Sequence, residues 1–512
     1  MNAPASTLLY SGSDWNFDTL QRIYDACETI AIGELDLNVY PNRIEVITSE
    51  QMLDAYASTG MPIFYKHWSF GKQFLANDLL YRKGLRGLAY ELVINSDPCI
   101  SYVMEENSAT MQTLVIAHAA FGHNHFFKNN YVFRQWTDAE GILDYLEFAR
   151  HYIARCEERH GQAEVERVLD SAHALMQQGI HRYPRAAPLN LNAERRREEE
   201  RRAYEESNYN ALWRTLPNKK PTHRESRDMR QKSLGLPQEN LLYFLEKSAP
   251  RLRGWQREIL RIVRLIAQYF YPQRQTKVMN EGCAVWVHYN ILKRLHETGQ
   301  ITEGAFLEFL HSHSNVLYQP TYDSGHYSGH NPYALGFGIM EDIERICRDP
   351  SDEDRRWFAE FAGCGDPLNV LKDAWANYRD ESFIAQFLSP HLIRKWRLFK
   401  LDDREKDEEV EVAAIHDEQG YQEIRRTLAR HHDVAGIDPD IQIVDVDFDS
   451  DRKLMLEHNV RDRVLLQREE ARQVLQHLAD LWGYQVILTE VDAADRKTLN
   501  SYAIDPRPGI FY

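Results

Sequence analysis

Apolar residues recur at helical spacing through most of the first 400 residues. Residues 17–30 and 241–270 place apolar side chains three or four positions apart, the spacing of a helix that buries one face. A short alternating stretch around Ile44 and Val46 predicts a strand. We therefore expect residues 1–400 to form one mostly α-helical domain with a few short strands.

The pattern changes after residue 400. An acidic stretch at 401–409 is typical of a solvated linker. Beyond it we expect strands and helices in the order β-α-β-β-α-β: strands at 410–415, 441–448, 454–458 and 484–489, and helices at 418–432 and 468–482. This order is the ferredoxin-like, split βαβ arrangement. It predicts a small C-terminal α+β domain over residues 408–512, with an accessory or regulatory role rather than a catalytic one.

Two further regions are harder to interpret. Residues 193–207 mix acidic and basic side chains densely, which favours a solvated helix face over an interaction tail. They lead into a polar stretch at 217–237, rich in Pro and Gly, that predicts an exposed loop. The apolar runs at 88–94 and 100–104 fit short strands or buried helix equally well, because such short runs show no decisive period.

Composition narrows the class of protein. The 512 residues include 61 basic and 77 acidic side chains, for a formal charge of −16, and 43% are hydrophobic. These values are typical of a globular chain and exclude a fibrous or disordered one; a net-acidic chain without a basic stripe also disfavours nucleic-acid binding. Six scattered cysteines without a CxxC pair, no apolar run long enough to span a membrane, and no signal-peptide pattern predict a cytoplasmic protein.

Histidines gather in three segments. The first, VIAHAAFGHNHFFKNNY, holds His118, His123 and His125. His118 and His123 are five positions apart, which is about 140° around an ideal α-helix. The two rings would therefore not share a face unless Gly122, which lies between them, ends or bends the helix.

The other two segments lie far downstream. VMNEGCAVWVHYNIL places Glu281 and His288 along one helical face, and the small residues Gly282 and Ala284 would let another helix approach closely. The third segment holds His311, His313, His326 and His330 ahead of a helix that Asn331 caps and Pro332 starts. His326 and His330 lie in a Gly/Ser-rich loop, which favours surface positions over ligand roles.

Four ionisable residues fall on apolar helix faces: His118, His123, Glu281 and His288. Burying that many charged or polar groups costs free energy unless something pairs them. Neutral imidazoles and a carboxylate are normal ligands of a divalent metal. A single histidine on an apolar face is more often a hydrogen-bonded core residue, so spacing alone leaves both interpretations open.

Several long motifs resemble the SpoVR family (stage V sporulation protein R-like): AIGELDLNVYPNRIEVITSEQMLDAYASTGMPIFYKHWSFGK, HAAFGHNHFFKNNY, MNEGCAVWVHYNIL, HSHSNV, NPYALGF and DESFIAQFLSP. The resemblance covers nearly the whole chain. It implies a link to the spore cortex, a peptidoglycan layer, and to sporulation or stress physiology. It also implies two partners from the family's gene neighbourhood, a PrkA-type serine protein kinase and a protein with a von Willebrand factor A-like domain.

The resemblance also suggests a comparison with gluzincin metallopeptidases, and with it a zincin-like fold as one option. His118 and His123 would correspond to the paired histidines of those enzymes, and Glu281 to their third ligand. Two departures stand out, because the histidine spacing is H-x4-H and Ala119 replaces the catalytic glutamate. A general base would then come from elsewhere, with Glu105, Glu106 and Glu381 as candidates.

Three hypotheses of function follow. The first is a metal-dependent hydrolase of a peptidoglycan-related amide or peptide, with zinc held by His118, His123 and Glu281. His288 and His313 would then serve as a fourth ligand, a hydrogen-bond partner of the ligands or an oxyanion stabiliser. The second keeps the same triad but binds Fe(II), as in non-haem iron oxygenases. The third is a non-catalytic regulator that works with the kinase system.

Overall fold

The computed structural model describes residues 8–57, 65, 67–68, 91–182, 231, 234–321, 329–402, 411–447 and 450–509. The charged segment 193–207, most of the polar stretch 217–237, His326 and most of the acidic stretch 401–409 lie outside the described residues. The chain divides into two compact units. Unit 1 comprises residues 1–155 and 269–437, and unit 2 comprises residues 156–268 and 438–512.

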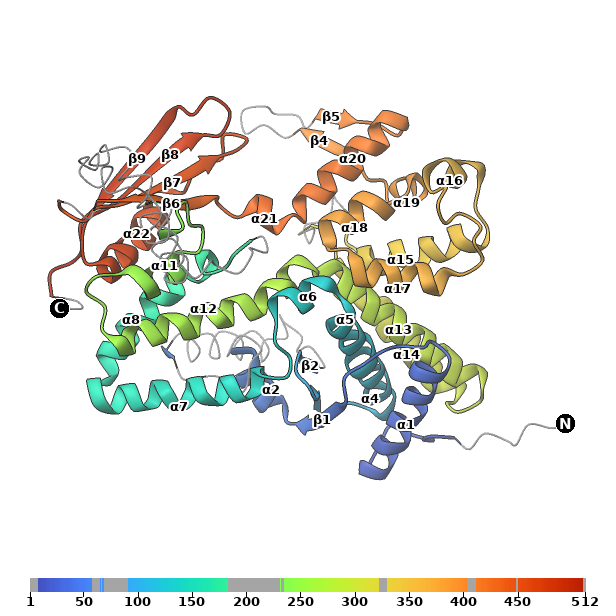
Figure 1. Ribbon diagram of the computed structural model, residues 1–512. Helices are drawn as coiled ribbons and strands as arrows, with labels where there is room; N and C mark the ends of the chain where they lie inside the picture. The colour runs from blue at the N-terminus through green and yellow to red at the C-terminus, as the bar shows by residue number, and fades with distance from the viewer. Residues whose placement is uncertain are drawn as a thin grey trace, which may run out of the picture. The chain divides into compact units, whose positions relative to one another are not determined.

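Unit 1 is mostly helical (Figure 1). Its first half contains α1 (Phe17–Gly33), β1 (Asn42–Ile47), α2 (Ser49–Ala57), β2 (Glu91–Ile94), β3 (Cys99–Met104), α4 (Ala109–Ile116), the π-helix η1 (Ala117–His123), α5 (Asn124–Asn129) and α6 (Tyr131–Trp136). Helices α7 (Ile142–His160) and α12 (Gly254–Gln275) each include residues of both units. The second half of unit 1 contains α13 (Lys277–Glu297), α14 (Glu303–Val316), α15 (Pro332–Arg348), α16 (Asp352–Trp357), α17 (Pro367–Asn377), α18 (Asp380–Phe387), α19 (Pro390–Lys395), β4 (Lys400–Asp402), β5 (Glu411–Ala414), α20 (Glu418–His431) and α21 (Val434–Ile437).

A small sheet in unit 1 has the strand order β1-β3-β2. Strand β1 runs parallel to β3, and β2 runs antiparallel to it. Every residue of β3 is buried, which explains why its sequence is apolar at every position except Ser101 instead of alternating. The described parts of the two short apolar runs are therefore strands, and β2 begins at Glu91.

Helix α13 packs against η1 on one side and α15 on the other, and glycines allow both contacts. A Cβ atom at Gly122 would lie 2.6 Å from Ala284 Cα, and one at Gly282 would lie 2.6 Å from Gly336 Cα. A side chain at any of these glycines would therefore push two helices apart. The prediction that Gly282 and Ala284 permit close helix approach is confirmed.

We expect Gly336→Ala to destabilise unit 1 by about 1–3 kcal/mol, the usual cost of overpacking a core. The added Cβ would lie 2.1 Å from the carbonyl oxygen of Val278, a backbone atom that cannot rotate away. Urea denaturation followed by circular dichroism measures the change. Gly304→Ala is the matched control, because its nearest neighbour is 3.9 Å away. Equal midpoints for the two variants would contradict this account of the helix contact.

Unit 2 contains α8 (Gln162–Ala174), the 3₁₀ turn η2 (Met176–Gln178), α11 (Leu241–Ser248), α22 (Arg468–Trp482) and four strands. The strands β6 (Ile441–Val446), β7 (Leu454–Val460), β8 (Val486–Asp492) and β9 (Thr498–Ile504) form one sheet in that order. Only β7 and β8, which α22 connects, are parallel. The prediction of a largely helical chain with a small C-terminal sheet is confirmed.

The predicted ferredoxin-like strand set is wrong in two respects. The stretch expected as its first strand forms β5, which pairs with β4 in a separate two-stranded sheet. The fourth strand of the sheet is β9, whose residues expose most of their side chains and so give little alternating signal. Helix α20 inserts Tyr421, Ile424 and Leu428 into the core of unit 1, so residues 408–437, assigned to the C-terminal domain from sequence, lie in unit 1.

Candidate metal centre

A π-helix brings His118 and His123 together. Segments α4, η1 and α5 form one continuous helical rod, and within η1 the backbone widens so that Asn124 N–H donates to the carbonyl of Ala119, five residues back. Residues five apart therefore come near one another along the same side, and the two imidazole centroids are 4.6 Å apart. Such single π-turns inside α-helices occur often at functional sites. The convergence expected from a bend at Gly122 is produced by this wider turn instead.

Two carboxylates face the histidine pair. Glu281 comes from α13, and its Oε2 lies 3.6 Å from His123 Nε2 and 3.9 Å from His118 Nε2. Glu91 comes from the start of β2, and its Oε1 lies 3.2 Å from His118 Nε2. One ligand atom each from Glu91, His118 and His123 lie within 4.8 Å of one another. The cluster thus joins residues from three elements that are distant in sequence.

The outer nitrogens of both imidazoles are held by hydrogen bonds. His118 Nδ1 lies 2.9 Å from His288 Nδ1, and His288 Nε2 lies 3.0 Å from His313 Nδ1. His123 Nδ1 lies 2.9 Å from the amide oxygen of Asn280. The amide oxygen can only accept, so we assign a proton to His123 Nδ1, which leaves Nε2 as a lone pair towards Glu281.

The hydrogen bonds that link His118, His288 and His313 also permit a proton on Nδ1 of His118. If His118 Nδ1–H donates to His288, then His288 Nε2–H donates to His313, and every nitrogen between them is satisfied. When His118 is neutral in this tautomer, its Nε2 also presents a lone pair to the carboxylates. Hydrogen bonds that fix the far ring nitrogen are the usual way in which proteins orient histidine ligands of a metal.

Burial keeps most of these imidazoles neutral. Desolvation lowers the pKa of His123 and of His313 to about 4, and it holds the pKa of His288 well below the ordinary value. Burial also works against charge on His118, but Glu91 and Glu281 outweigh it and raise its pKa. Neutral imidazole is the form that binds metals.

The two carboxylates are tuned in opposite directions. Burial raises the pKa of Glu91 to about 7, although His118 opposes the shift. Burial also works to raise the pKa of Glu281, but His118 and His123 outweigh it and hold that pKa below the ordinary value. A pair of neighbouring acids with diverging pKa values is a common feature of sites that use one as a charged group and the other as a proton carrier.

The donor set fits a divalent cation. Glu281 Oε2 is buried and has no hydrogen-bond partner among the described residues; His123 Nε2 and His118 Nε2 stand 3.6 and 3.9 Å away, beyond hydrogen-bond distance. Ligands of a tetrahedral ion at 2.0–2.2 Å stand about 3.4 Å apart, close to the separations of 3.2–3.9 Å found here. Two imidazoles and one carboxylate, with a second carboxylate beside them, suit zinc or Fe(II).

Asp380 supports the helix that carries Glu281. Its carboxylate accepts hydrogen bonds from the backbone N–H groups of Val278 and Met279 at 2.8 and 2.9 Å, which belong to the otherwise unpaired first turn of α13. Burial raises the pKa of Asp380 to about 7, although these hydrogen bonds oppose the shift. Asp380 therefore fixes the start of α13 next to the cluster.

The structure brings together some of the residues proposed from sequence and separates others. His118, His123, Glu281, His288 and His313 form one connected group. Glu105 and Glu106 are exposed, and Glu106 accepts a hydrogen bond from the backbone of Ser49. Glu381 lies on α18, 3.5 Å from Arg379. None of these three glutamates contacts the described histidine cluster.

The remaining histidines have other partners. His125 Nδ1 accepts a hydrogen bond from the backbone of Asn38, which makes it a core residue beside the cluster. His311 is exposed on α14 and bonds Asn315. Sequence reasoning missed Glu91, Asn280 and Asp380. A signal existed for Glu91, the one acidic residue in an apolar run, whereas Asn280 and Asp380 act through contacts that no local pattern reveals.

Comparison with known proteins shows the family of this chain. The profile of the family described as "SpoVR like protein" matches residues 14–437, and that of the "SpoVR-like C-terminal domain" matches residues 439–493. A relative from Escherichia coli (strain K12), described as "Uncharacterized protein YcgB", is 53% identical over 486 residues. The match covers 95% of this chain and 94% of the relative's length. No solved structure matches the chain. Among the described helices, none has the length and apolar character needed to cross a membrane. The chain belongs to the SpoVR family.

Proposed function

We propose that this protein is a metal-dependent hydrolase whose cation is held by His118, His123 and Glu281, with Glu91 as the proton carrier. The observation that supports this most directly is the buried Oε2 of Glu281, which faces two imidazole nitrogens at 3.6 and 3.9 Å and has no hydrogen-bond partner among the described residues. A buried carboxylate oxygen in that setting is expensive without a counter-ion. A divalent cation would satisfy the carboxylate and both lone pairs together.

The accessibility of the cluster supports a catalytic site over a purely structural one. The imidazoles of His118 and His123 are only 4% and 9% exposed, whereas the carboxylates of Glu91 and Glu281 keep 17% and 16% of their surface. The carboxylates form the more exposed side of the cluster, although Glu281 Oε2 itself is buried. Structural zinc sites are closed by four protein ligands, while catalytic ones leave a position open.

When bound, the cation would polarise a scissile carbonyl and lower the pKa of an attacking water. Glu91 would accept a proton from that water as its oxygen bonds to the carbonyl carbon, and would deliver it to the amine nitrogen as the C–N bond breaks. Water and an amide are consumed, and an acid and an amine are formed. His288 and His313 would hold His118 in place through their hydrogen bonds.

The substrate class rests on the family. Its association with the spore cortex favours an amide bond of a peptidoglycan-related peptide. The placement of two histidines on one helix and a glutamate on another resembles the gluzincin arrangement in type, without its HExxH motif. Glu91 then takes the place of the glutamate that Ala119 replaces. Zinc is the expected cation, and Fe(II) with the same ligands would instead indicate oxygenase chemistry.

Metal content tests the proposal. The full chain, purified without added metal, should carry about one divalent ion per chain by inductively coupled plasma mass spectrometry. His118→Ala and His123→Ala should each lose most of it, because each removes a ligand. His125→Ala is the matched control, since that buried histidine lies two positions away and bonds the Asn38 backbone instead. Metal-free wild-type protein that also fails to take up zinc or Fe(II) in equilibrium dialysis would refute the proposal.

A further inference from the structure

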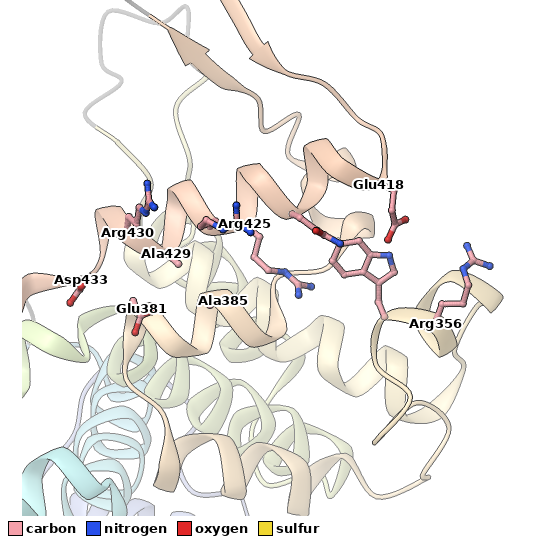
Figure 2. A pocket seen from close by; sticks show the side chains of 11 residues that line it. Arg356, Glu381, Ala385, Glu418, Arg425, Ala429, Arg430 and Asp433 are labelled. Carbon is pink, nitrogen blue, oxygen red and sulfur yellow. The ribbon is translucent and has the colours of Figure 1, made fainter. Parts of the chain in front are cut away.

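A cavity lies in unit 1, between helices α16, α18 and α20 (Figure 2). Its volume is about 900 Å³, within the range of small-molecule sites. None of the residues that line it belongs to the candidate metal centre. Four arginines contribute to the lining, three of them from α20: Arg356, Arg425, Arg426 and Arg430.

Arg425 is a half-buried cation without an acidic partner among the described residues. Its Nε donates to the carbonyl of Leu388 at 2.8 Å, and its guanidinium lies over the Trp357 ring, 4.6 Å from the centroid. Nη2 is buried and has no hydrogen-bond partner among the described residues, and no described carboxylate forms an ion pair with this side chain. Burial lowers the pKa of Arg425 to about 10. An uncompensated guanidinium in this position is costly.

Trp357 supplies a second unused donor to the same cavity. Its indole Nε1 is buried and, like Arg425 Nη2, has no acceptor among the described residues. Leaving a buried N–H unsatisfied costs free energy comparable to a lost hydrogen bond. Two such donors on one cavity, stacked against each other, both require an acceptor, and a bound oxyanion would supply it.

The remaining charges leave the cavity with a positive excess. Three carboxylates also line it, Glu381, Glu418 and Asp433, so the four arginines exceed the acids by one. Arg379, which lies outside the lining, is 3.5 Å from Glu381 and 3.7 Å from Asp433 and offsets part of their charge. Arg356 and Arg430 are exposed and lie at opposite ends of the cavity (Figure 2). Figure 2 shows the Arg425 side chain reaching from α20 into the space between them.

We infer that this cavity binds a small anionic ligand through a phosphate or carboxylate group, which accepts hydrogen bonds from Arg425 and Trp357 when these side chains turn their buried N–H groups towards it. The guanidinium fork suits both oxyanions, since either can accept two parallel N–H bonds. Arg356 and Arg430 would attract the ligand from solvent. Glu381, considered above as a general base, then belongs to this binding cavity and not to the histidine cluster.

Calorimetric titration of the full chain tests the inference, with inorganic phosphate and citrate as separate probes at constant ionic strength. Saturable binding of at least one probe is expected. Stronger binding of phosphate would indicate a phosphorylated ligand, and stronger binding of citrate a carboxylate one. Arg425→Lys should weaken binding about tenfold or more, because it keeps the charge but loses the fork. Prior chelation of the protein should leave binding unchanged, which separates this cavity from the metal centre.

A neighbouring pair of arginines provides the control. Arg356 lines the cavity and Arg355, its neighbour on α16, does not, although both are exposed. Arg356→Gln should weaken binding several-fold, and Arg355→Gln should leave it unchanged. Both are surface changes, so they remain informative if Arg425→Lys fails to fold. The inference is overturned if neither probe binds saturably, if both glutamine variants lose affinity equally, or if folded Arg425→Lys binds as tightly as wild type.

Discussion

Exhaustive chelation should lower the thermal unfolding midpoint of the wild-type chain by roughly 6 °C. A ligand that binds only the folded state stabilises it by about 4 kcal/mol when its free concentration is a thousand times Kd, and each kcal/mol is worth about 1.5 °C in a unit as large as unit 1. His118 and Glu281 come from helices that are distant in sequence and meet only in the fold. The unfolded chain therefore has no site to compete. Differential scanning calorimetry with and without chelator measures the shift.

Glu281→Ala should remove most of this sensitivity. The variant loses a ligand, so its midpoint should already lie near that of the chelated wild type and should change little on adding chelator. Restoring zinc to the chelated wild type should recover the original midpoint, which distinguishes metal loss from irreversible damage. An unchanged wild-type midpoint under chelation, in protein that contains no metal, would mean that the cluster is a hydrogen-bonded core network.

The parts of the fold predicted well from sequence are those with local signals. Amphipathic spacing identifies helices such as α1 and α12, and the Asn331-Pro332 pair marks the start of α15, where the Asn331 side chain accepts a hydrogen bond from Tyr333 N. Alternation identifies β7, whose side chains are buried at every second position. Strand β9 lacks this signal because it buries little. Strand pairing, as for β5 with β4, depends on distant contacts that periodicity does not encode.

The candidate site also contains both residues that the sequence predicts and contacts that it does not. His118, His123, Glu281 and His288 could be predicted because each is an ionisable group on an otherwise apolar helix face. Their convergence could not be derived from α-helical geometry, since five residues correspond to about 140°. The π-turn supplies the missing rotation, and Gly122 within it lies in close contact with Ala284. Glu91 joins the site through sheet pairing, which local pattern does not predict.

Glu91→Gln and Glu281→Gln should separate catalysis from metal binding. Both replacements nearly preserve volume and remove one charge. We expect Glu281→Gln to lose the metal, because the amide no longer offsets a divalent cation. Glu91→Gln should retain most of the metal, held by His118, His123 and Glu281, and yet lose activity by about 10²–10⁴-fold, the usual contribution of a general base. Glu105→Gln, an exposed carboxylate outside the cluster, is the matched control and should behave as wild type.

Complementation of a deletion strain under cell-wall stress is the readout, with metal content and soluble level measured for each variant. Loss of complementation by folded, metal-loaded Glu91→Gln would support a proton-transfer role. Replacement of a structural ligand would remove the metal as well, and replacement of a scaffold residue would leave complementation intact. Loss of metal in Glu91→Gln would instead make Glu91 a fourth ligand, and the site would then be closed and structural. Full rescue by both glutamine variants would refute the hydrolase proposal, since a regulator that works by binding needs neither charge.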